Sequence, residues 1–136
     1  MKLATTVPTE LPPVFVDPGH LQQVLINLLT NAIEATPAGG RVEVTAAPLT
    51  QDENPGVAIA VRDTGSGIPE QVLPRIFDPF FSTKPAHVGT GLGLSICRDL
   101  VKSNGSDIQV ASQPGEGTVF TVWLPAARSD RGKEQS

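Results

Sequence analysis

The sequence predicts an α+β domain: a two-layer α/β sandwich with a mixed, mostly antiparallel sheet and its helices on one face. Three observations indicate this class. The predicted elements follow the order strand, helix, two strands, loop, helix, two strands. Strands adjacent in the chain have short links, which favour antiparallel pairing. The length of 136 residues suits one domain with a single hydrophobic core.

The first two elements have clear local signals. Residues 14–17, VFVD, form a short apolar run that fits a strand. Asp17 is a suitable N-cap, and Pro18 occupies the first helical position. A helix is therefore predicted from Pro18 to about Thr36, where Pro37 and two glycines stop it.

The later strands alternate apolar and polar residues, and the second helix shows the helical period. Between the two halves, a glycine-rich segment containing an aromatic cluster is predicted as loop. The predicted strands are 41–47, 57–63, 107–112 and 118–125, the second helix is 92–103, and the loop is 65–93. Residues 1–12 are predicted as a lead-in segment, 13–125 as the folded domain and 126–136 as a disordered tail.

Composition excludes several classes of protein. The chain has ten basic and fourteen acidic residues, and the basic ones are scattered, so nucleic acid is not expected as a main partner. Glutamines and asparagines interrupt the longest apolar run, which excludes a membrane-spanning helix, and no apolar leader opens the chain. The single cysteine, Cys97, excludes a disulfide framework or a cysteine-based zinc site. We therefore expect a cytoplasmic domain that makes no membrane contact.

A line of polar side chains runs along the first predicted helix. At about 100° per residue, Asn27, Asn31 and Glu34 fall within an arc of about 60°, and Gln23 and His20 extend the stripe. A solvated helix face is one explanation, although such faces usually carry lysine, arginine and glutamate. Amide oxygens beside a carboxylate also suit Mg²⁺, which completes its shell with phosphate oxygens and water. The pattern alone leaves both explanations open.

Two glycine-rich segments follow. DTGSGIP (63–69) begins where an apolar strand ends, so Asp63 could accept a hydrogen bond from an exocyclic amine, although an ordinary Asp-Gly turn explains the motif as well. GTGLGLSI (89–96) leads three glycines into a helix, so free amides and the positive end of the helix dipole face one point, as in an anion site. Glycine flexibility in a mobile loop is the alternative. Between them, RIFDPFFSTKP fits a lid, from which Lys84 could reach a terminal phosphate.

With these segments in order, the chain resembles the ATP-binding catalytic domain of sensor histidine kinases. This domain belongs to the GHKL superfamily, together with gyrase-type, mismatch-repair and heat-shock chaperone ATPases. QQVLINLLTNAIEA resembles the N box, DTGSGIP the G1 box, FDPFF the F box, GTGLGLSI the G2 box and GEGTVF (115–120) the last glycine motif. The resemblance covers residues 13–125, and it implies the GHKL ATP-binding fold.

The resemblance implies a role for each matching residue. Asn31 would ligate the Mg²⁺ that bridges the phosphates, and Asn27 would support it. Asp63 would recognise the adenine amine, and Thr118 would help through a water. The implied ATP-binding residues are Asn27, Asn31, Glu34, Asp63, Gly65, Gly67, Ile68, Phe77, Lys84, Gly89, Thr90, Gly91, Leu92, Gly93, Leu94 and Thr118. Of these, the catalytic residues would be Asn27, Asn31 and Lys84, with Phe77–Lys84 forming the lid.

The first N-box position discriminates between activities within the superfamily. Its ATPases commonly place a glutamate there to activate water, whereas this chain has Asn27, which cannot act as a general base. We therefore expect a protein-histidine kinase that hydrolyses ATP poorly and transfers the phosphoryl group by positioning and charge neutralisation. Its cofactors would be ATP and Mg²⁺. The chain departs from the usual pattern at Glu34, which could touch a metal-bound water, and at Asn104, where a histidine is frequent.

The acceptor histidine of such kinases lies in a preceding dimerisation domain. No corresponding motif occurs here, and neither His20 nor His87 fits that role. We therefore expect a monomeric fragment whose partners are the dimerisation and histidine-phosphotransfer domain of the same kinase and a downstream response regulator. The full-length kinase could be membrane-anchored. The alternatives are an anti-sigma-type protein-serine kinase of the same fold and a non-catalytic nucleotide-sensing module.

Overall fold

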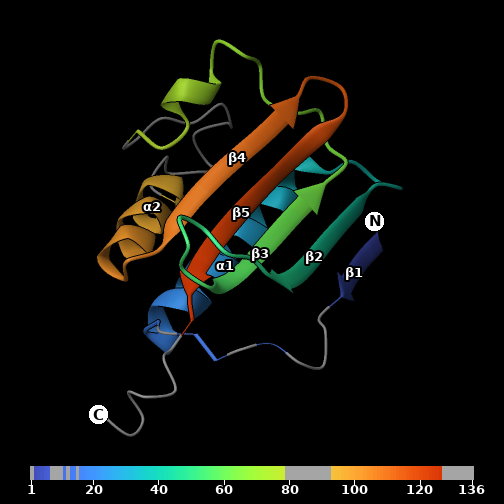
Figure 1. Ribbon diagram of the computed structural model, residues 1–136. Helices are drawn as coiled ribbons and strands as arrows, with labels where there is room; N and C mark the ends of the chain where they lie inside the picture. Colours follow the sequence, from blue (N-terminus) through green and yellow to red (C-terminus); the bar gives the residue numbers. More distant parts are fainter. Residues whose placement is uncertain (1, 7–10, 12, 15, 79–92, 127–136) are drawn as a thin grey trace, which may run out of the picture.

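Five strands form one sheet in the order β1–β2–β3–β5–β4, and both helices cover the same face of it (Figure 1). The computed structural model describes residues 2–6, 11, 13–14, 16–78 and 93–126. β1 pairs with β2 in parallel, whereas the other neighbours pair antiparallel. The predicted two-layer α+β class with a mixed, mostly antiparallel sheet is thereby confirmed.

Most elements agree with the predicted ranges to within one residue at each end. The strands are β1 (Lys2–Thr6), β2 (Arg41–Pro48), β3 (Gly56–Asp63), β4 (Asp107–Gln113) and β5 (Gly117–Pro125). The helices are α1 (Pro18–Ala35) and α2 (Gly93–Ser103), and a short 3₁₀ helix, η1 (Leu73–Arg75), lies between β3 and α2.

The first strand was predicted in the wrong place. In the segment 14–17, Val14 makes only an isolated bridge with Ala126, and the described residues after it lie outside any strand. The strand is instead Lys2–Thr6, within the predicted lead-in, and it pairs with Arg41–Thr45 of β2. The outer edge of β2 offers unpaired backbone groups, which a segment can satisfy without an apolar pattern of its own. Of the predicted tail, only Ala126 lies within the described residues.

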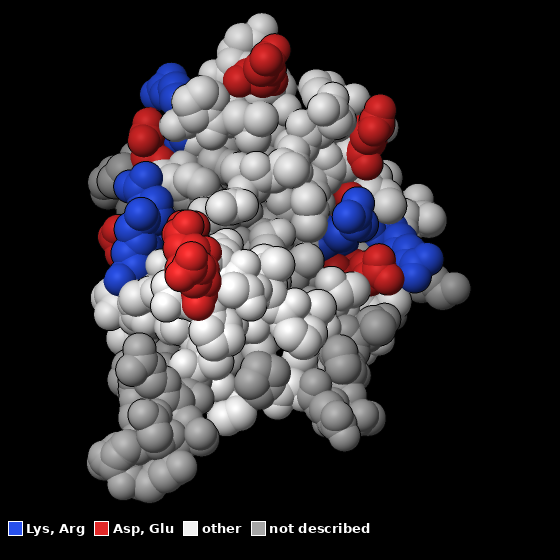
Figure 2. Space-filling model, in the orientation of Figure 1, with Lys and Arg blue, Asp and Glu red and all other residues white. Residues whose placement is uncertain are grey.

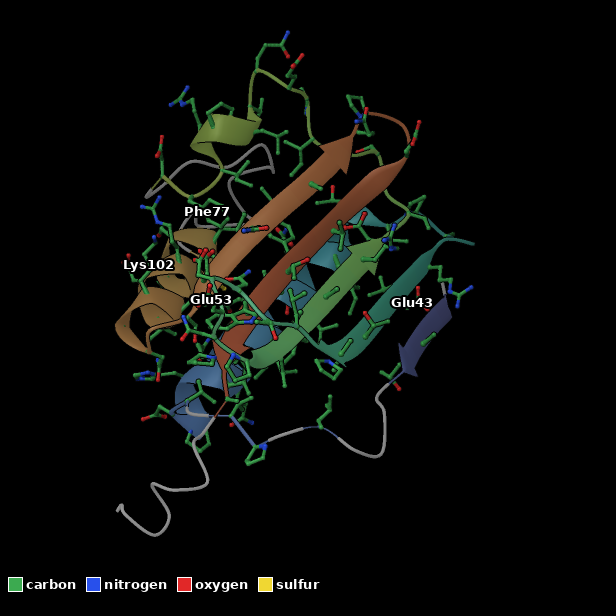
Figure 3. The ribbon with its side chains drawn as sticks, in the orientation of Figure 1. Glu43, Glu53, Phe77 and Lys102 are labelled. Carbon is green, nitrogen blue, oxygen red and sulfur yellow. The ribbon has the colours of Figure 1, made fainter. Side chains whose placement is uncertain are left out.

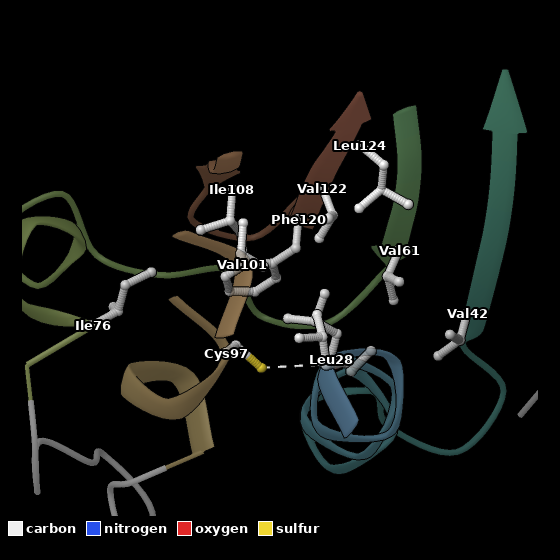
Figure 4. Close-up of a cluster of buried hydrophobic side chains, with 12 residues drawn as sticks. Leu28, Val42, Val61, Ile76, Cys97, Val101, Ile108, Phe120, Val122 and Leu124 are labelled. Atoms are coloured by element: carbon white, nitrogen blue, oxygen red, sulfur yellow. Dashed lines mark hydrogen bonds between the residues drawn. The ribbon is translucent and has the colours of Figure 1, made fainter. Parts of the chain in front are cut away.

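The hydrophobic core lies between the sheet and the helices (Figure 4). On α1 the buried residues are four apart, at Val24, Leu28 and Ala32, so they form one stripe along the helix. The buried core consists of Val24, Leu28, Ala32, Val42, Val61, Ile76, Cys97, Val101, Ile108, Phe120, Val122 and Leu124. Because every layer contributes to this core, the sheet and both helices hold one another in place.

A hydrogen-bonded cluster joins the start of α1 to the end of α2. Asp17 caps α1 as predicted, because its Oδ1 accepts hydrogen bonds from the backbone N–H groups of Gly19 (2.8 Å) and His20 (3.1 Å). Asn104 Oδ1 accepts from the Asp17 N–H at 2.9 Å, while Asn104 Nδ2 donates to Leu100 O at 2.8 Å and lies 2.9 Å from His20 Nδ1. This is the structural role of the asparagine that replaces the frequent histidine.

Acidic and basic side chains lie in small separate groups on the face of the sheet turned away from the helices (Figure 2). Within the described part of the chain, no helix has both the length and the apolar character needed to cross a bilayer.

Candidate functional site

Three polar residues form a row across one end of the sheet. Strand pairing places Asp63 of β3 opposite Thr118 of β5, and Thr118 opposite Ser112 of β4. Paired residues carry their Cβ atoms on the same face, roughly 4.5–5.5 Å apart. Two positions along, the same strands contribute Val61 and Phe120 to the core, so the row lies on the side that faces the helices. Asp63 is only 4% exposed and Thr118 only 7%. These two polar residues are therefore buried at one end of an otherwise apolar face of the sheet.

The Asp63 carboxyl is the buried acceptor of this row. Burial raises its pKa above the ordinary value, although hydrogen bonds from the backbone N–H groups of Gly65 and Thr118 oppose the shift. The Gly65 N–H donates to Asp63 Oδ1 at 2.8 Å. A carboxylate taken out of water gains stability from each further donor. A ligand N–H group that reaches the Asp63 carboxylate would therefore donate a hydrogen bond that stabilises its charged form.

The G1 segment after Asp63 packs tightly against protein backbone on two sides. A Cβ on Gly65 would lie 2.3 Å from Ala35 O at the end of α1, and a Cβ on Gly67, whose φ is +81°, would lie 2.2 Å from Gln113 O. The two glycines are thus required by the approach of α1 and of the β4–β5 turn. Their predicted contact with a base stays a prediction, as does that of Ile68, which is half-buried against the core.

The asparagine line of α1, which consists of Asn27 and Asn31, faces α2. The Cys97 Sγ donates to Val24 O at 3.7 Å, and a side-chain hydrogen bond from Asn27 partly offsets the burial that raises the pKa of Cys97 to about 11. Because the start of α1 contacts the end of α2, the helices run antiparallel, and the next turn after Asn27 brings Asn31 toward the first turn of α2. The contact of Asn27 with buried Cys97 argues against a simple solvated face.

The two asparagines are half-buried, whereas Glu34 is exposed in the last turn of α1. Gln23 Nε2 donates to Asn27 Oδ1 at 3.0 Å, so polar contacts continue along the line. The first turn of α2 includes Gly93 and Leu94, and this end of the helix carries the positive end of the helix dipole. The arrangement therefore leads from the buried Asp63 end, past amide side chains, to an anion-favouring helix terminus.

Phe77 begins the predicted lid, and it is held between the sheet and α2 (Figure 3). Its ring meets that of Phe120 edge to face, with the centroids 6.3 Å apart and an interplanar angle of 82°. The Arg98 guanidinium lies 5.8 Å from the Phe77 centroid. The other predicted lid and G2 residues, Lys84, Gly89, Thr90, Gly91 and Leu92, and also His87, lie outside the described residues.

Two residues that organise this site, Ser112 and Thr64, were not predicted from the sequence. Ser112 Oγ accepts the Ile68 N–H at 2.7 Å, and Thr64 Oγ1 accepts the Arg41 N–H at 2.8 Å, which fixes the turn between α1 and β2. The strand period could have indicated Ser112, because it follows Ile108 and Val110 on the inward-facing positions of β4. No local pattern indicates Thr64.

A buried carboxyl end, followed along α1 by amide side chains that lead to the N-terminus of a second helix, is the arrangement expected of an ATP-binding domain built on a two-layer α/β sandwich. The family model described as "Histidine kinase-, DNA gyrase B-, and HSP90-like ATPase" matches residues 16–128. The chain belongs to this family.

Proteins of similar sequence show which type of domain within this family the chain resembles. The sensor histidine kinase ZraS of Escherichia coli K12 is 45% identical over 125 residues, which cover 92% of this chain and 26% of ZraS. Sporulation kinase E of Bacillus subtilis 168 is 41% identical over 120 residues, covering 88% of this chain and 16% of that kinase. The chain thus spans about a quarter, or less, of these relatives.

Solved structures agree with the sequence relatives. The catalytic domain of histidine kinase ThkA, in a nucleotide-free form, superposes with a TM-score of 0.77 at 36% identity, covering 92% of this chain and 78% of that one. Full-length ShkA in complex with AMPPNP gives a TM-score of 0.78 at 33% identity, covering 94% of this chain and 26% of ShkA. The chain is therefore an ATP-binding domain of the sensor histidine kinase type, and the serine-kinase alternative is not favoured.

Proposed function

We propose that this domain binds Mg-ATP and donates the γ-phosphoryl group to a histidine on the dimerisation domain of its kinase. The observation that supports this most directly is the geometry of α1. Its half-buried asparagines run from the Asp63 end of the sheet toward the N-terminus of α2, which is the direction that a nucleotide must take from base to phosphates.

Base recognition would rest on Asp63 and Thr118. The buried carboxylate accepts a hydrogen bond from the exocyclic amine of adenine, and Thr118, directly opposite in the sheet, bonds to the same edge of the base through a water. Because Asp63 is buried, a base that cannot donate a hydrogen bond would leave its carboxylate with only the backbone donors of Gly65 and Thr118.

The donor chemistry of α1 fits Mg²⁺. Amide oxygens are hard ligands, and Mg²⁺ usually takes few protein ligands beside phosphate oxygens and water. Among the described residues no cluster of three or more His, Cys, Asp or Glu side chains could hold a metal, so Asn31 is the proposed ligand, with Asn27 beside it. When bound, the ion neutralises charge on the phosphates. Asn27 offers no general base for water, which favours transfer over hydrolysis.

The remaining roles rest on sequence. Lys84 would bind the terminal phosphate, Gly89–Gly93 would enclose the triphosphate, and Glu34 would contact a metal-bound water. The partners would be the dimerisation and histidine-phosphotransfer domain and a downstream response regulator, with the domain itself monomeric and cytoplasmic. ShkA, which has the same fold, binds an ATP analogue.

Calorimetric titration with AMPPNP, with and without Mg²⁺, tests the binding step. We expect the wild type to bind more tightly with Mg²⁺ and Asn31→Ala to lose this enhancement. Gln22→Ala, an exposed change on the same helix but off the asparagine line, is the matched control. Absence of binding by the folded wild type would refute the proposal.

The transfer step needs an acceptor. Mixing the domain with a histidine-bearing dimerisation domain of a related kinase and labelled ATP should produce an acid-labile, base-stable phosphoprotein. Acid-stable phosphoserine on the partner would favour the anti-sigma type instead. Binding of ATP without transfer to any supplied acceptor would favour the nucleotide-sensing module.

A further inference from the structure

Ser112 of β4 contacts both the G1 segment and β5. These contacts lie at the base-recognition end, which is the end of the sheet that carries Asp63 and Thr118. The Ser112 Oγ accepts the Ile68 N–H of the G1 segment at 2.7 Å. It also lies 3.0 Å from Gly117 O and 2.8 Å from Thr118 Oγ1, both on β5. The serine hydroxyl therefore contacts the G1 segment and one of the two residues assigned to base recognition.

A count of protons limits how these bonds can be arranged. A serine hydroxyl has one proton and two lone pairs. One lone pair receives the Ile68 N–H, and the proton points to Gly117 O, a backbone acceptor within a strand. The second lone pair then receives the proton of Thr118. In this arrangement every group at Ser112 is satisfied, and Thr118 Oγ1 turns only lone pairs toward the ligand.

We propose that Ser112 is a positioning residue for base selection, which holds the Thr118 hydroxyl as an acceptor beside the Asp63 carboxylate. Two acceptors side by side favour a purine that carries a donor at position 6, as adenine does. They disfavour a 6-oxo purine, which would place an acceptor there. The inference rests on the proposed function, since it concerns how that same site selects its nucleotide.

The role of Ser112 in base selection can be distinguished from a role in holding the G1 segment in place. The Gly115 N–H donates to Ser66 O at 2.7 Å, so a second bond also ties this segment to the β4–β5 turn. Removing the Ser112 hydroxyl leaves that bond in place and frees the proton of Thr118. The freed proton can then be donated to the bridging water, which can in turn donate a proton to a 6-oxo group, so the change should relax selectivity as well as weaken binding.

The test is calorimetric titration of the whole chain with ADP and with inosine diphosphate, which carries a 6-oxo group. In Ser112→Ala we expect the ratio of the inosine diphosphate Kd to the ADP Kd to fall by roughly threefold to tenfold, the worth of one hydrogen bond. Ser112→Thr, which keeps the hydroxyl, should restore the ratio. Ser106→Ala is the matched control, because the buried Ser106 Oγ has no hydrogen-bond partner among the described residues.

Each outcome decides a different question. If the wild type binds ADP and the ratio is the same in Ser112→Ala, the inference is wrong while the proposed function stands. If the folded wild type does not bind ADP, the proposed function fails first. If Ser112→Ala does not fold, Thr118→Val removes the other hydroxyl of the pair, and an unchanged ratio in that variant overturns the inference.

Discussion

Two aspartates lie near opposite ends of α1 and have contrary electrostatic settings: Asp17 caps its start, whereas Asp63 ends β3 in the sheet, close to the last residues of the helix. Hydrogen bonds from backbone N–H groups, led by that of His20, lower the pKa of Asp17, whereas burial raises the pKa of Asp63. The 18 residues of α1 place its two ends roughly 27 Å apart. The fold thus uses one carboxylate for its own stability and keeps the other in an unfavourable environment.

The difference shows what separates a structural cluster from a candidate binding site. Around Asp17, the Asn104 amide oxygen, the Asn104 amide nitrogen and the helix N–H groups all find partners within the protein. Around Asp63, a carboxylate is buried on an apolar face, where its charge is disfavoured. A ligand that donates hydrogen bonds improves the second environment and has nothing to add to the first.

The largest effect is expected for Asp63→Asn. Because an amide N–H₂ would face the donor of the base, affinity for AMPPNP should fall at least roughly a hundredfold. The melting temperature should stay the same or rise, because a buried charge is removed. Calorimetry and thermal unfolding measure the two effects. Affinity within about threefold of wild type would mean that Asp63 does not contact the ligand.

Asn104→Ala should have the opposite effects to Asp63→Asn: it should lower stability and leave affinity unchanged. It removes the bonds to the Asp17 N–H and Leu100 O, so we expect the free energy of unfolding to drop by about 1–3 kcal/mol, with AMPPNP affinity unchanged. Urea unfolding measures the loss, and Lys102→Ala, an exposed change on the same helix, is the control. A loss of affinity in the folded variant would show that the two ends are coupled.

The smallest effect is expected for Asp17→Asn, and it lies in the pH dependence. Asparagine keeps a capping oxygen but not the charge. Because the folded pKa of Asp17 lies below 3.8, its charge stabilises the fold above that value, and the benefit is lost as pH falls through the folded pKa. Melting temperatures from neutral to acid pH should therefore show a small wild-type advantage that shrinks in acid.

Asp63→Asn provides the opposite trend in the same experiment. The folded pKa of Asp63 lies above 3.8, so its ionisation costs stability as pH rises through the folded value. The stability gained by Asp63→Asn should therefore be present near neutral pH and disappear below 3.8. If both variants changed with pH in the same direction, the contrast between the two ends would be wrong.

The sequence by itself determined most elements and the candidate site residues that lie on them. The cap at Asp17, the helical line of Asn27 and Asn31, and the strand that ends at Asp63 are local patterns, readable from a few neighbouring residues. For this reason the ranges of all the predicted helices and strands except the first strand agreed to within one residue, and the family could be identified from five motifs. The assignments of individual residues to ATP and Mg²⁺ remain predictions.

Only the tertiary structure decided which distant segments meet. Lys2–Thr6 forms a strand because it pairs with the edge of β2. Ser112 bonds to Ile68, 44 residues away, because the strand register places the two close together. Asn104 likewise meets Asp17 across 87 residues. Such bonds leave no periodic signal, because they satisfy backbone groups whose positions are set by the packing of the whole sheet and both helices.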